Sequence, residues 1–274
     1  MQYNYRTAVG LALILLLACY WKTVAGMAEQ WMNDEDMGHG FAVPLAMGWI
    51  LWRERDRWSQ LRPAPTFQGF FFLVAGAALQ AVGVLGAGLF ISSVGMLFSA
   101  IGIVLALGGW AYLRAWSFPL LLSLFMLPKL AIVYNMVTLP LQLTASKLAA
   151  GMLTVSGIGV VREGNILDVG GHRVAVADAC NGIRFLLPLG FVSVVFAYMS
   201  DPKPWMRLAI LGAAVPLAIL ANAVRVAVSA WIPLFDSGTP HQIAGYLIFA
   251  FTLVALLPFR YLINLLYGGR QHAV

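Results

Sequence analysis

The chain has 274 residues, of which 61% are hydrophobic and 10% are charged, and its mean hydropathy is +0.83. A soluble domain is about half apolar and a quarter charged, so this composition excludes an ordinary soluble protein and indicates a polytopic membrane protein. The net charge of +6 is explained more simply by topology and anionic lipid than by nucleic acid. We therefore expect membrane lipid, and no nucleic acid, as a partner.

Apolar blocks follow one another along the chain, and helices are the economical way to satisfy their backbones in lipid. They cover 7–26, 39–52, 67–87, 89–113, 115–134, 180–199, 206–232 and 242–266. The first has no small-residue cleavage site and is expected to be a retained span. The sequence therefore predicts an all-α polytopic membrane protein with about eight transmembrane helices, in a single integral-membrane domain over 1–274.

The distribution of basic and acidic residues predicts the orientation. With the N-terminus in the cytoplasm, the inner loops collect most arginines and lysines, and the outer loops collect most acids. The opposite orientation violates the positive-inside rule at nearly every loop. Both termini are therefore expected inside.

The longest stretch between blocks, about 135–179, is expected on the outer side. Its first part, 135–155, is apolar and is either a helix lying in the membrane interface or a ninth hydrophobic segment. We prefer the interfacial helix, because a ninth span would move Lys203 and Arg207 to the outside. The second part alternates and contains Gly170-Gly171, which predicts a short β-hairpin leading into the cysteine of the sixth block.

Residues of three types that are costly at membrane depth fall at the same predicted level. Cys180 begins the sixth block, Arg225 lies in the last two turns of the seventh, and His241 starts the eighth. Each alone has an ordinary explanation: a packed thiol, an arginine reaching the headgroups, and a histidine at a helix start. Together they predict one site at the outer face.

The chemistry of these residue types is that of acyl transfer through a thioester. A histidine can take the thiol proton and return it to a leaving amine, and an arginine can stabilise the oxyanion of the tetrahedral intermediate. The histidines at 39, 172, 241 and 272 show no metal-binding spacing. No metal and no cofactor are therefore expected.

Further residues are candidates for supporting or substrate-binding roles. Arg184 lies one turn after the cysteine and can pair with Asp178 or bind a substrate carboxylate. Asn222 lies one turn before Arg225 and can orient it. His39 follows an acidic segment and has either a role in the site or a structural role in a solvated loop.

Five segments in the same order resemble the exosortases and archaeosortases. "DACNGIRFLLP", from Asp178, resembles their cysteine block; "NAVRV", from Asn222, their arginine block; and "HQIAGYLIF", from His241, their histidine block with its following glycine and aromatic residue. "GHGFAVPLAMGWILWRER" and "VVREGNIL" resemble their early His-Gly segment and the stretch before the cysteine. The resemblance covers about 30–255 of the chain.

The resemblance implies a multispanning cysteine enzyme of the bacterial inner membrane with its active site facing the periplasm. Its substrates would be exported proteins with a C-terminal sorting signal: a Pro-Glu-Pro-like motif, a hydrophobic helix and a basic tail. Residue by residue, Cys180 matches the nucleophile, Arg225 the transition-state arginine and His241 the acid/base. The acyl group would pass to water or to an unidentified acceptor nucleophile.

The sequence departs from the family pattern at three positions. Asn181 stands where serine is usual, Asp178 replaces glutamate, and Gln242 follows the histidine where an acid is common. The last change leaves Asp178 or Asp236 as possible orienting partners of His241.

An alternative class is a transporter or an assembly protein for lipid-linked polymers. In that class Arg184 and Arg225 would bind an anionic headgroup, and the cysteine would be dispensable.

Overall fold

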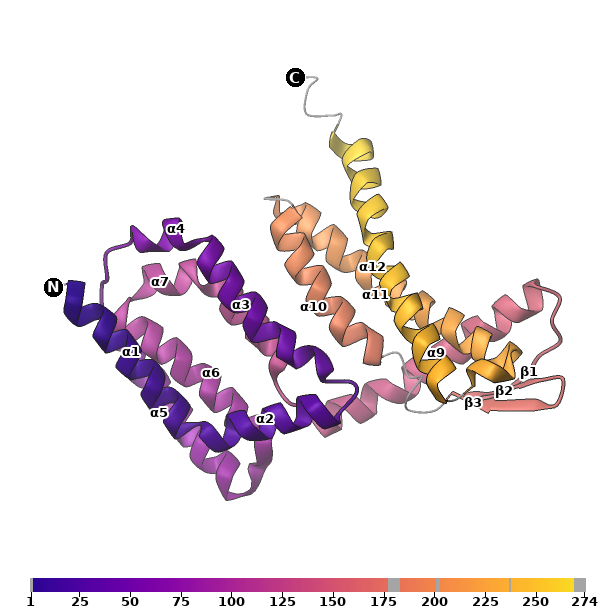
Figure 1. Cartoon of the computed structure of the whole chain (residues 1–274), viewed down its shortest axis with the longest axis horizontal. Helices are drawn as coiled ribbons and strands as arrows, with labels where there is room; N and C mark the ends of the chain where they lie inside the picture. Colours follow the sequence, from indigo (N-terminus) through magenta and orange to yellow (C-terminus); the bar gives the residue numbers. More distant parts are fainter. Residues whose placement is uncertain (1, 177–182, 201–202, 237, 269–274) are drawn as a thin grey trace. The chain divides into compact units, whose positions relative to one another are not determined.

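The structure, a computed structural model, describes residues 2–176, 183–200, 203–236 and 238–268 (Figure 1). It is mostly helical with one small sheet, which confirms the predicted helical class and the small β segment before the sixth apolar block. The chain divides into two compact units, Met1–Leu130 (unit 1) and Ala131–Val274 (unit 2), and each is described by itself. The prediction of a single domain over 1–274 stays a prediction.

Unit 1 consists of helices and short helical turns. In chain order they are α1 (Gln2–Cys19), α2 (Trp21–Asn33), the 3₁₀ turn η1 (Gly38–Phe41), α3 (Ala42–Arg53), α4 (Arg55–Ser59), α5 (Gln68–Val82), the π-helical turn η2 (Gly83–Ala87), α6 (Gly88–Leu107), α7 (Trp110–Ala115), α8 (Ser117–Leu122) and the 3₁₀ turn η3 (Ser123–Met126).

Helices α5 and α6 form a close pair because glycine and serine line their contact. A Cβ atom on Gly76 would lie 2.7 Å from the carbonyl oxygen of Gly95 and 2.8 Å from the backbone nitrogen of Ser99. Small residues let helix backbones approach in this way in membranes, where the hydrophobic effect does not drive helices together. The chain reverses between the two helices at Gly86 and Gly88, which have φ angles of 150° and 86° that side chains disfavour.

A bend separates α1 from α2 within the first predicted span. The two helices meet at 69°, and Tyr20 lies between them, 3% exposed. Its hydroxyl bonds the carbonyl oxygen of Gly76 at 2.9 Å and the hydroxyl of Ser99 at 2.8 Å. These bonds attach the bend to the α5–α6 pair. They also provide hydrogen-bond partners for the phenol hydroxyl, which lies in an apolar environment.

The last residues of unit 1 hold a cluster of charges. The Nζ atom of Lys129 lies 2.7 Å from a carboxylate oxygen of Asp34 and 2.8 Å from one of Asp36. The three side chains are 12–24% exposed, so the pairs are partly shielded from solvent. They connect the segment after η3 to the segment after α2.

Unit 2 contains the rest of the chain. Its elements are α9 (Ala131–Val155), β1 (Val161–Glu163), β2 (Ile166–Val169), β3 (His172–Ala175), α10 (Ile183–Ser200), α11 (Pro204–Trp231), the 3₁₀ turn η5 (Pro233–Phe235) and α12 (Gly238–Gly268). Helix α11 contacts α9, α10 and α12, so it is the central helix of the unit.

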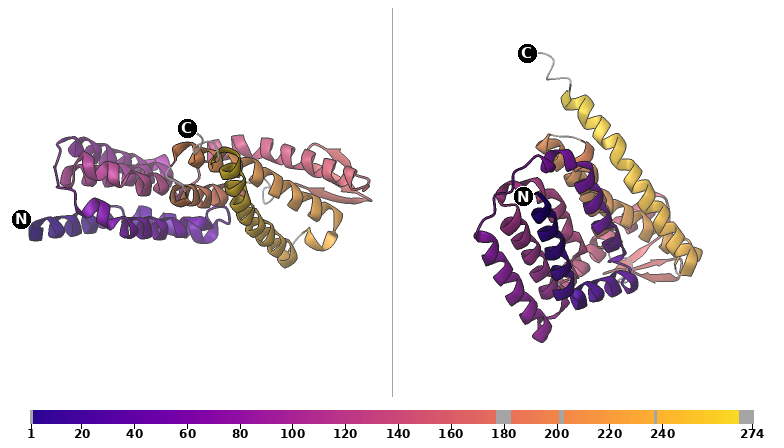
Figure 2. Two further views of the ribbon diagram at one scale, coloured as in Figure 1. Left: turned by 90° about the horizontal axis from the view of Figure 1, so that it is seen from above. Right: turned by 60° about the vertical axis from the view of Figure 1, so that its left-hand side comes forward.

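The strands form an antiparallel sheet in the order β1-β2-β3 that packs on α9 and α11 (Figure 2). The predicted hairpin is confirmed as β2 and β3, whose turn uses positive φ at Gly170 and Gly171, as a type I′ turn requires. The prediction was too short, because β1 adds a third strand. Leu167, Val174 and Val176 bury the inner face of the sheet in one cluster with α9 and α11.

Among the described residues, the helices long and apolar enough to cross a membrane are Gln68–Gly86, Gly88–Leu107, Pro204–Trp231 and Gly238–Pro258. Two further pairs of consecutive helices are bent at short breaks. If each bent pair is counted as one span, the number of candidate spans in the described residues rises to six. The chain therefore has membrane-spanning helices, and the predicted count of about eight stays a prediction. The breaks interrupt the blocks at 7–26 and 115–134; in the second, Pro128 cannot donate to a helix and disfavours one before it.

Candidate active site

Helices α11 and α12 bring Arg225 and His241 into direct contact. The Nη2 atom of Arg225 lies 2.6 Å from the Nε2 atom of His241. Arg225 is 2% exposed, and it lies on the side of α11 that the rest of unit 2 covers. A buried guanidinium is costly unless polar groups bind it, so the imidazole is part of what stabilises this charge.

The contacts at both ring nitrogens together define the protonation pattern of the imidazole. A guanidinium only donates hydrogen bonds, so the Nε2 atom of His241 is the acceptor and carries no proton. The ring proton of the neutral imidazole is then on Nδ1. The Nδ1 atom lies 2.7 Å from the backbone carbonyl oxygen of Phe235, which accepts that N–H. The ring is therefore held at both nitrogens.

Ser229 completes the Nδ1 side of the ring. This serine follows Arg225 by one turn of α11 and is 3% exposed. Its hydroxyl donates to the carbonyl oxygen of Phe235 at 2.9 Å, and its oxygen lies 3.3 Å from Nδ1 of His241. The sequence analysis missed Ser229, although a serine four residues after an arginine, in an apolar helix, was a signal for it.

The guanidinium of Arg225 also packs against the backbone of α12 at Gly245, one turn after His241. A Cβ atom at this position would lie 3.3 Å from Nε and 3.4 Å from Cζ of Arg225. Gly245 therefore gives the guanidinium the space that it occupies beside the ring, which a larger residue would reduce.

The backbone carbonyl of Phe235 contacts Nδ1 of His241, for which Asp178 and Asp236 were the predicted orienting partners. Asp236, one of the two acids considered, directs its carboxylate to within 3.9 Å of the Nε2 atom of His172, the first residue of β3. The other, Asp178, lies outside the described residues. The turn η5 leads the chain back to α11 and presents the carbonyl of Phe235 to the ring.

The remaining predicted site residues of unit 2 are placed in part. Asn222 is 2% exposed and lies on the buried side of α11, one turn before Arg225. Arg184 is the second residue of α10. Cys180 and Asn181 lie outside the described residues. Their predicted roles stay predictions.

His39 belongs to unit 1, in η1 and outside the candidate spans. Its Nε2 atom lies 3.0 Å from the carbonyl oxygen of Phe125 in η3. Burial lowers the pKa of His39 below its ordinary value, and hydrogen bonds with the carbonyls of Phe125 and Asp36 offset only part of that effect. The ring therefore connects two turns of unit 1 in its neutral form, which favours the structural interpretation of this residue.

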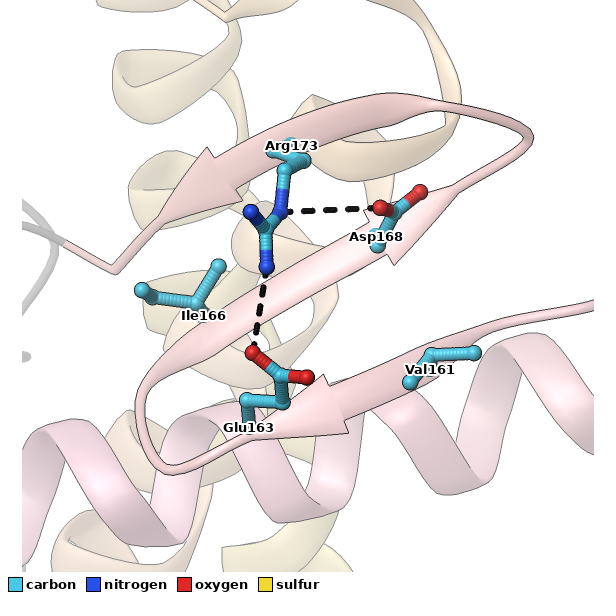
Figure 3. A pocket seen from close by; sticks show the side chains of 5 residues that line it. All are labelled: Val161, Glu163, Ile166, Asp168 and Arg173. Atoms are coloured by element: carbon cyan, nitrogen blue, oxygen red, sulfur yellow. Dashed lines mark hydrogen bonds and ion pairs between the residues drawn. The ribbon is translucent and has the colours of Figure 1, made fainter.

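The outer face of the sheet carries a separate group of charges around a shallow depression (Figure 3). Arg173 on β3 reaches Asp168 on β2 at 3.6 Å and Glu163 on β1 at 3.1 Å. Arg173 and Glu163 are mostly exposed, so these pairs contribute little stability. Arg173 and Asp168 are directly opposite each other on adjacent strands, as in an ordinary cross-strand pair, and the Glu163 pair reaches across the middle strand β2.

In the described part of the chain, no group of three or more His, Cys, Asp or Glu residues is arranged to hold a metal ion. No curated protein and no solved structure matches the chain. The family model described as "Transmembrane exosortase (Exosortase_EpsH)" matches residues 31–258, a range that includes Cys180 and the Arg225–His241 pair. The chain therefore belongs to the transmembrane exosortase family.

Proposed function

We propose that this protein is a membrane-embedded cysteine peptidase or transpeptidase that cleaves the C-terminal sorting signal of exported proteins. The signal would comprise a Pro-Glu-Pro-like motif, a hydrophobic helix and a basic tail. The observation that carries the proposal is the contact of 2.6 Å between the buried Arg225 and the half-buried His241. It joins a fixed cation to an imidazole whose Nε2 atom is a proton acceptor, as acid–base and oxyanion chemistry require.

Chain connectivity supports Cys180 as the nucleophile of the same site. Val176, at the end of the sheet, is 1% exposed and packs in one buried cluster with Val226, the residue after Arg225. Four residues lead from Val176 to Cys180, a reach of at most about 14 Å. Three more residues lead to Ile183, where α10 begins and then packs on α11. The cysteine is therefore tethered at both ends to elements that contact the arginine helix.

The proposed reaction begins when the thiol of Cys180 gives its proton to Nε2 of His241. The thiolate attacks the scissile carbonyl, and Arg225 stabilises the resulting oxyanion. The tetrahedral intermediate collapses as the C–N bond breaks and the proton passes from Nε2 to the leaving amine. The thioester of Cys180 is then attacked by water or by an acceptor amine, whose proton Nε2 takes. The C–S bond breaks, and the proton returns from Nε2 to the sulfur of Cys180, which restores the thiol and the neutral imidazole.

The contact between Arg225 and His241 has to open during this cycle, because Nε2 cannot accept from the guanidinium and from the thiol together. A guanidinium binds an anionic thiolate or oxyanion more strongly than a neutral imidazole. The guanidinium therefore shifts toward the sulfur or the oxyanion as negative charge develops there, in the same step in which Nε2 takes the proton. Arg225 and His241 thus act alternately on the same reacting group.

The proposal includes a position for the enzyme in the cell. The protein would cross the bacterial inner membrane about eight times, with both termini in the cytoplasm and the active site open to the periplasm. This topology follows from the basic residues of the predicted inner loops. It presents the site to substrates after their export.

The lipid-linked polymer alternative is less well supported by the geometry. A headgroup site needs guanidinium donors that a phosphate can reach. Arg225 is 2% exposed and donates to an imidazole acceptor. That arrangement suits a proton-transfer pair better than the capture of an anionic lipid.

The experiment is co-expression with an exported reporter that carries a Pro-Glu-Pro motif, a hydrophobic helix and a basic tail. We expect wild-type enzyme to release the C-terminal helix, and Cys180→Ala to abolish release while inserting normally. Cys19→Ala is the matched control, because Cys19 is an exposed thiol on α1, and this variant should cleave like wild type.

Two results distinguish the functions. Cleavage by Cys180→Ala at the wild-type rate contradicts the cysteine mechanism. Loss of function in Arg225→Gln combined with full function in Cys180→Ser supports the lipid-linked alternative instead. Added hydroxylamine should trap the thioester in the wild-type protein. A trapped product that forms with wild type and is absent from the Cys180→Ala variant supports the proposed intermediate.

A further inference from the structure

The structure contains a feature of α11 that the cysteine mechanism by itself does not require. Arg225 and Ser229 are four residues apart, so they project from the same side of the helix. Arg225 donates to Nε2 of His241, at 2.6 Å, and the Ser229 oxygen lies 3.3 Å from Nδ1. One face of one helix therefore contacts both nitrogens of the same ring.

The donors and acceptors around the ring can be assigned individually. Ser229 has one hydroxyl proton, which it donates to the carbonyl oxygen of Phe235 at 2.9 Å. The Nδ1–H of His241 donates to the same oxygen at 2.7 Å. A carbonyl oxygen has two lone pairs and accepts both. The carbonyl is therefore bound from two directions, by the helix and by the ring.

This carbonyl lies at the end of the short turn η5, which is not itself part of α11 or α12. Within the turn, the backbone N–H of Phe235 donates to the carbonyl of Ile232. The hydroxyl of Ser229 connects the turn to α11, one helical turn from the catalytic arginine candidate. Since Ser229 is 3% exposed, bulk water has little access to replace the hydroxyl.

We propose that Ser229 is a positioning residue of the transpeptidase site, which acts by holding the Phe235 carbonyl against Nδ1 of His241. The carbonyl keeps the proton on Nδ1 and leaves Nε2 unprotonated and directed at Arg225. A serine hydroxyl and a backbone carbonyl thus perform the orienting function that a carboxylate performs in other cysteine and serine peptidases. This inference rests on the proposed function.

The consequence for catalysis concerns the ring tautomer. In a neutral imidazole either nitrogen can carry the proton, and the hydrogen bond made by one nitrogen decides the state of the other. When the carbonyl is free to move, the ring can adopt the Nε2–H tautomer, which cannot take a proton from the cysteine. The loss should appear in kcat, because Ser229 contacts the ring and η5 and is not part of the proposed substrate contacts.

The test compares Ser229→Ala with wild type in detergent or nanodiscs, using a peptide that contains the reporter's sorting motif. We expect kcat to fall by about tenfold with KM unchanged, as for the partial loss of a general base. Nitrogen NMR of ¹⁵N-histidine protein, with His241 assigned by difference against His241→Gln, should show a single Nδ1–H tautomer in wild type. It should show two tautomers in Ser229→Ala.

A matched control removes a different buried hydroxyl of unit 2. Ser193 on α10 is fully buried, and its oxygen makes no hydrogen bond within the described part of the chain. Ser193→Ala should keep the wild-type kcat and tautomer. Ser229→Thr, which retains the hydroxyl, should recover most of the activity.

The inference is overturned if Ser229→Ala keeps wild-type kcat and a single Nδ1–H tautomer while Cys180→Ala is inactive. If both Ser229→Ala and Cys180→Ala remain active, that result contradicts the proposed function instead. If Ser229→Ala does not accumulate in the membrane, the comparison of Ser229→Thr with Ser229→Val decides. These variants have similar shapes and differ in the hydroxyl, so equal activity of the two overturns the proposal.

Discussion

Arg225 on α11 and His241 on α12 form a part-buried hydrogen bond of 2.6 Å between a guanidinium and an unprotonated ring nitrogen. The two residues are 16 positions apart in the sequence, and the pair forms because η5 reverses the chain between two long helices. The contact places a permanent positive charge beside the proposed proton acceptor. It therefore favours a neutral imidazole in the resting protein.

The first prediction concerns the donor geometry of Arg225. Lysine retains a positive charge at this position but loses the planar set of donors that can bind an oxyanion and the imidazole in turn. We expect Arg225→Lys to lower kcat by about 10² to 10³-fold, which is typical for the loss of an oxyanion donor. The measurement is single-turnover cleavage of the sorting-motif peptide.

Arg207→Lys is the control for that change. Arg207 lies in the first turn of α11 and stacks on the ring of Tyr198 with 4.7 Å between Cζ and the ring centroid. The Arg207→Lys variant should cleave the peptide at the wild-type rate. Equal rates for Arg225→Lys and wild type would exclude a need for the guanidinium shape.

The second prediction concerns the space beside Arg225. In Gly245→Ala the new Cβ atom meets the guanidinium at 3.3–3.5 Å, so the side chain has to shift by a few tenths of an ångström. We expect a clear fall in kcat with little change in thermal stability, because alanine improves helix propensity by up to about 1 kcal/mol. The measurements are the cleavage rate and the melting temperature.

Gly212 provides the matched control, since it lies in α11 and a Cβ atom there has nothing within 4 Å. Gly212→Ala should keep the wild-type rate. A loss of activity in both alanine variants would mean that helix stiffening, and not crowding of Arg225, is the cause.

The third prediction concerns the end of the sheet, next to the cysteine segment. Asn165 donates from its side chain to the carbonyl oxygen of Val176 at 3.2 Å and to Oε1 of Gln142 at 3.3 Å. Its own carbonyl accepts from the N–H of Val176 at 2.8 Å. Asn165→Ala should destabilise the protein by about 1–2 kcal/mol and slow the alkylation of Cys180 or make it heterogeneous.

Alkylation is measured in a Cys19→Ala background, so that the reagent reports on Cys180. Thr154→Ala is the control, because Thr154 is an exposed residue near the end of α9. If Asn165→Ala changes stability but leaves the alkylation rate and cleavage unchanged, Asn165 supports the sheet and not the cysteine segment.

The fourth prediction concerns pH and unit 1. Burial lowers the pKa of His39 in the folded protein, so the neutral ring is favoured by folding. The stabilising contribution of this group is fully present above the unfolded-state pKa, about 6.5. It is lost as the pH falls from that value through the lowered folded-state pKa.

We therefore expect the melting temperature of wild type to fall more steeply than that of His39→Gln as the pH is lowered from 7.5 to 5. Glutamine can still donate to the carbonyl of Phe125 but does not titrate in this range. Parallel pH profiles for the two proteins would show that His39 is not responsible for acid sensitivity.

Composition and short-range patterns determined much of this fold before any contact was known. The apolar blocks at 67–87, 206–232 and 242–266 correspond to long helices, because a span of about 20 apolar residues has few alternatives. Gly170-Gly171 predicted the β2–β3 hairpin because both residues need a positive φ. The ordered cysteine, arginine and histidine segments indicated the family that the match over 31–258 shows.

Other features depended on contacts between distant residues, and only the tertiary structure decided them. The bend at Tyr20 is held by Gly76 and Ser99, and hydropathy in a window carries no information about such partners. The sequence proposed that Arg225 and His241 share one level, but their contact and the neutral ring follow from the packing of α11 on α12. The group in contact with Nδ1 of His241 at 2.7 Å is the main-chain carbonyl of Phe235. Every residue has the same carbonyl group, and only its position in the fold distinguishes that of Phe235. No pattern of side chains could therefore have identified it.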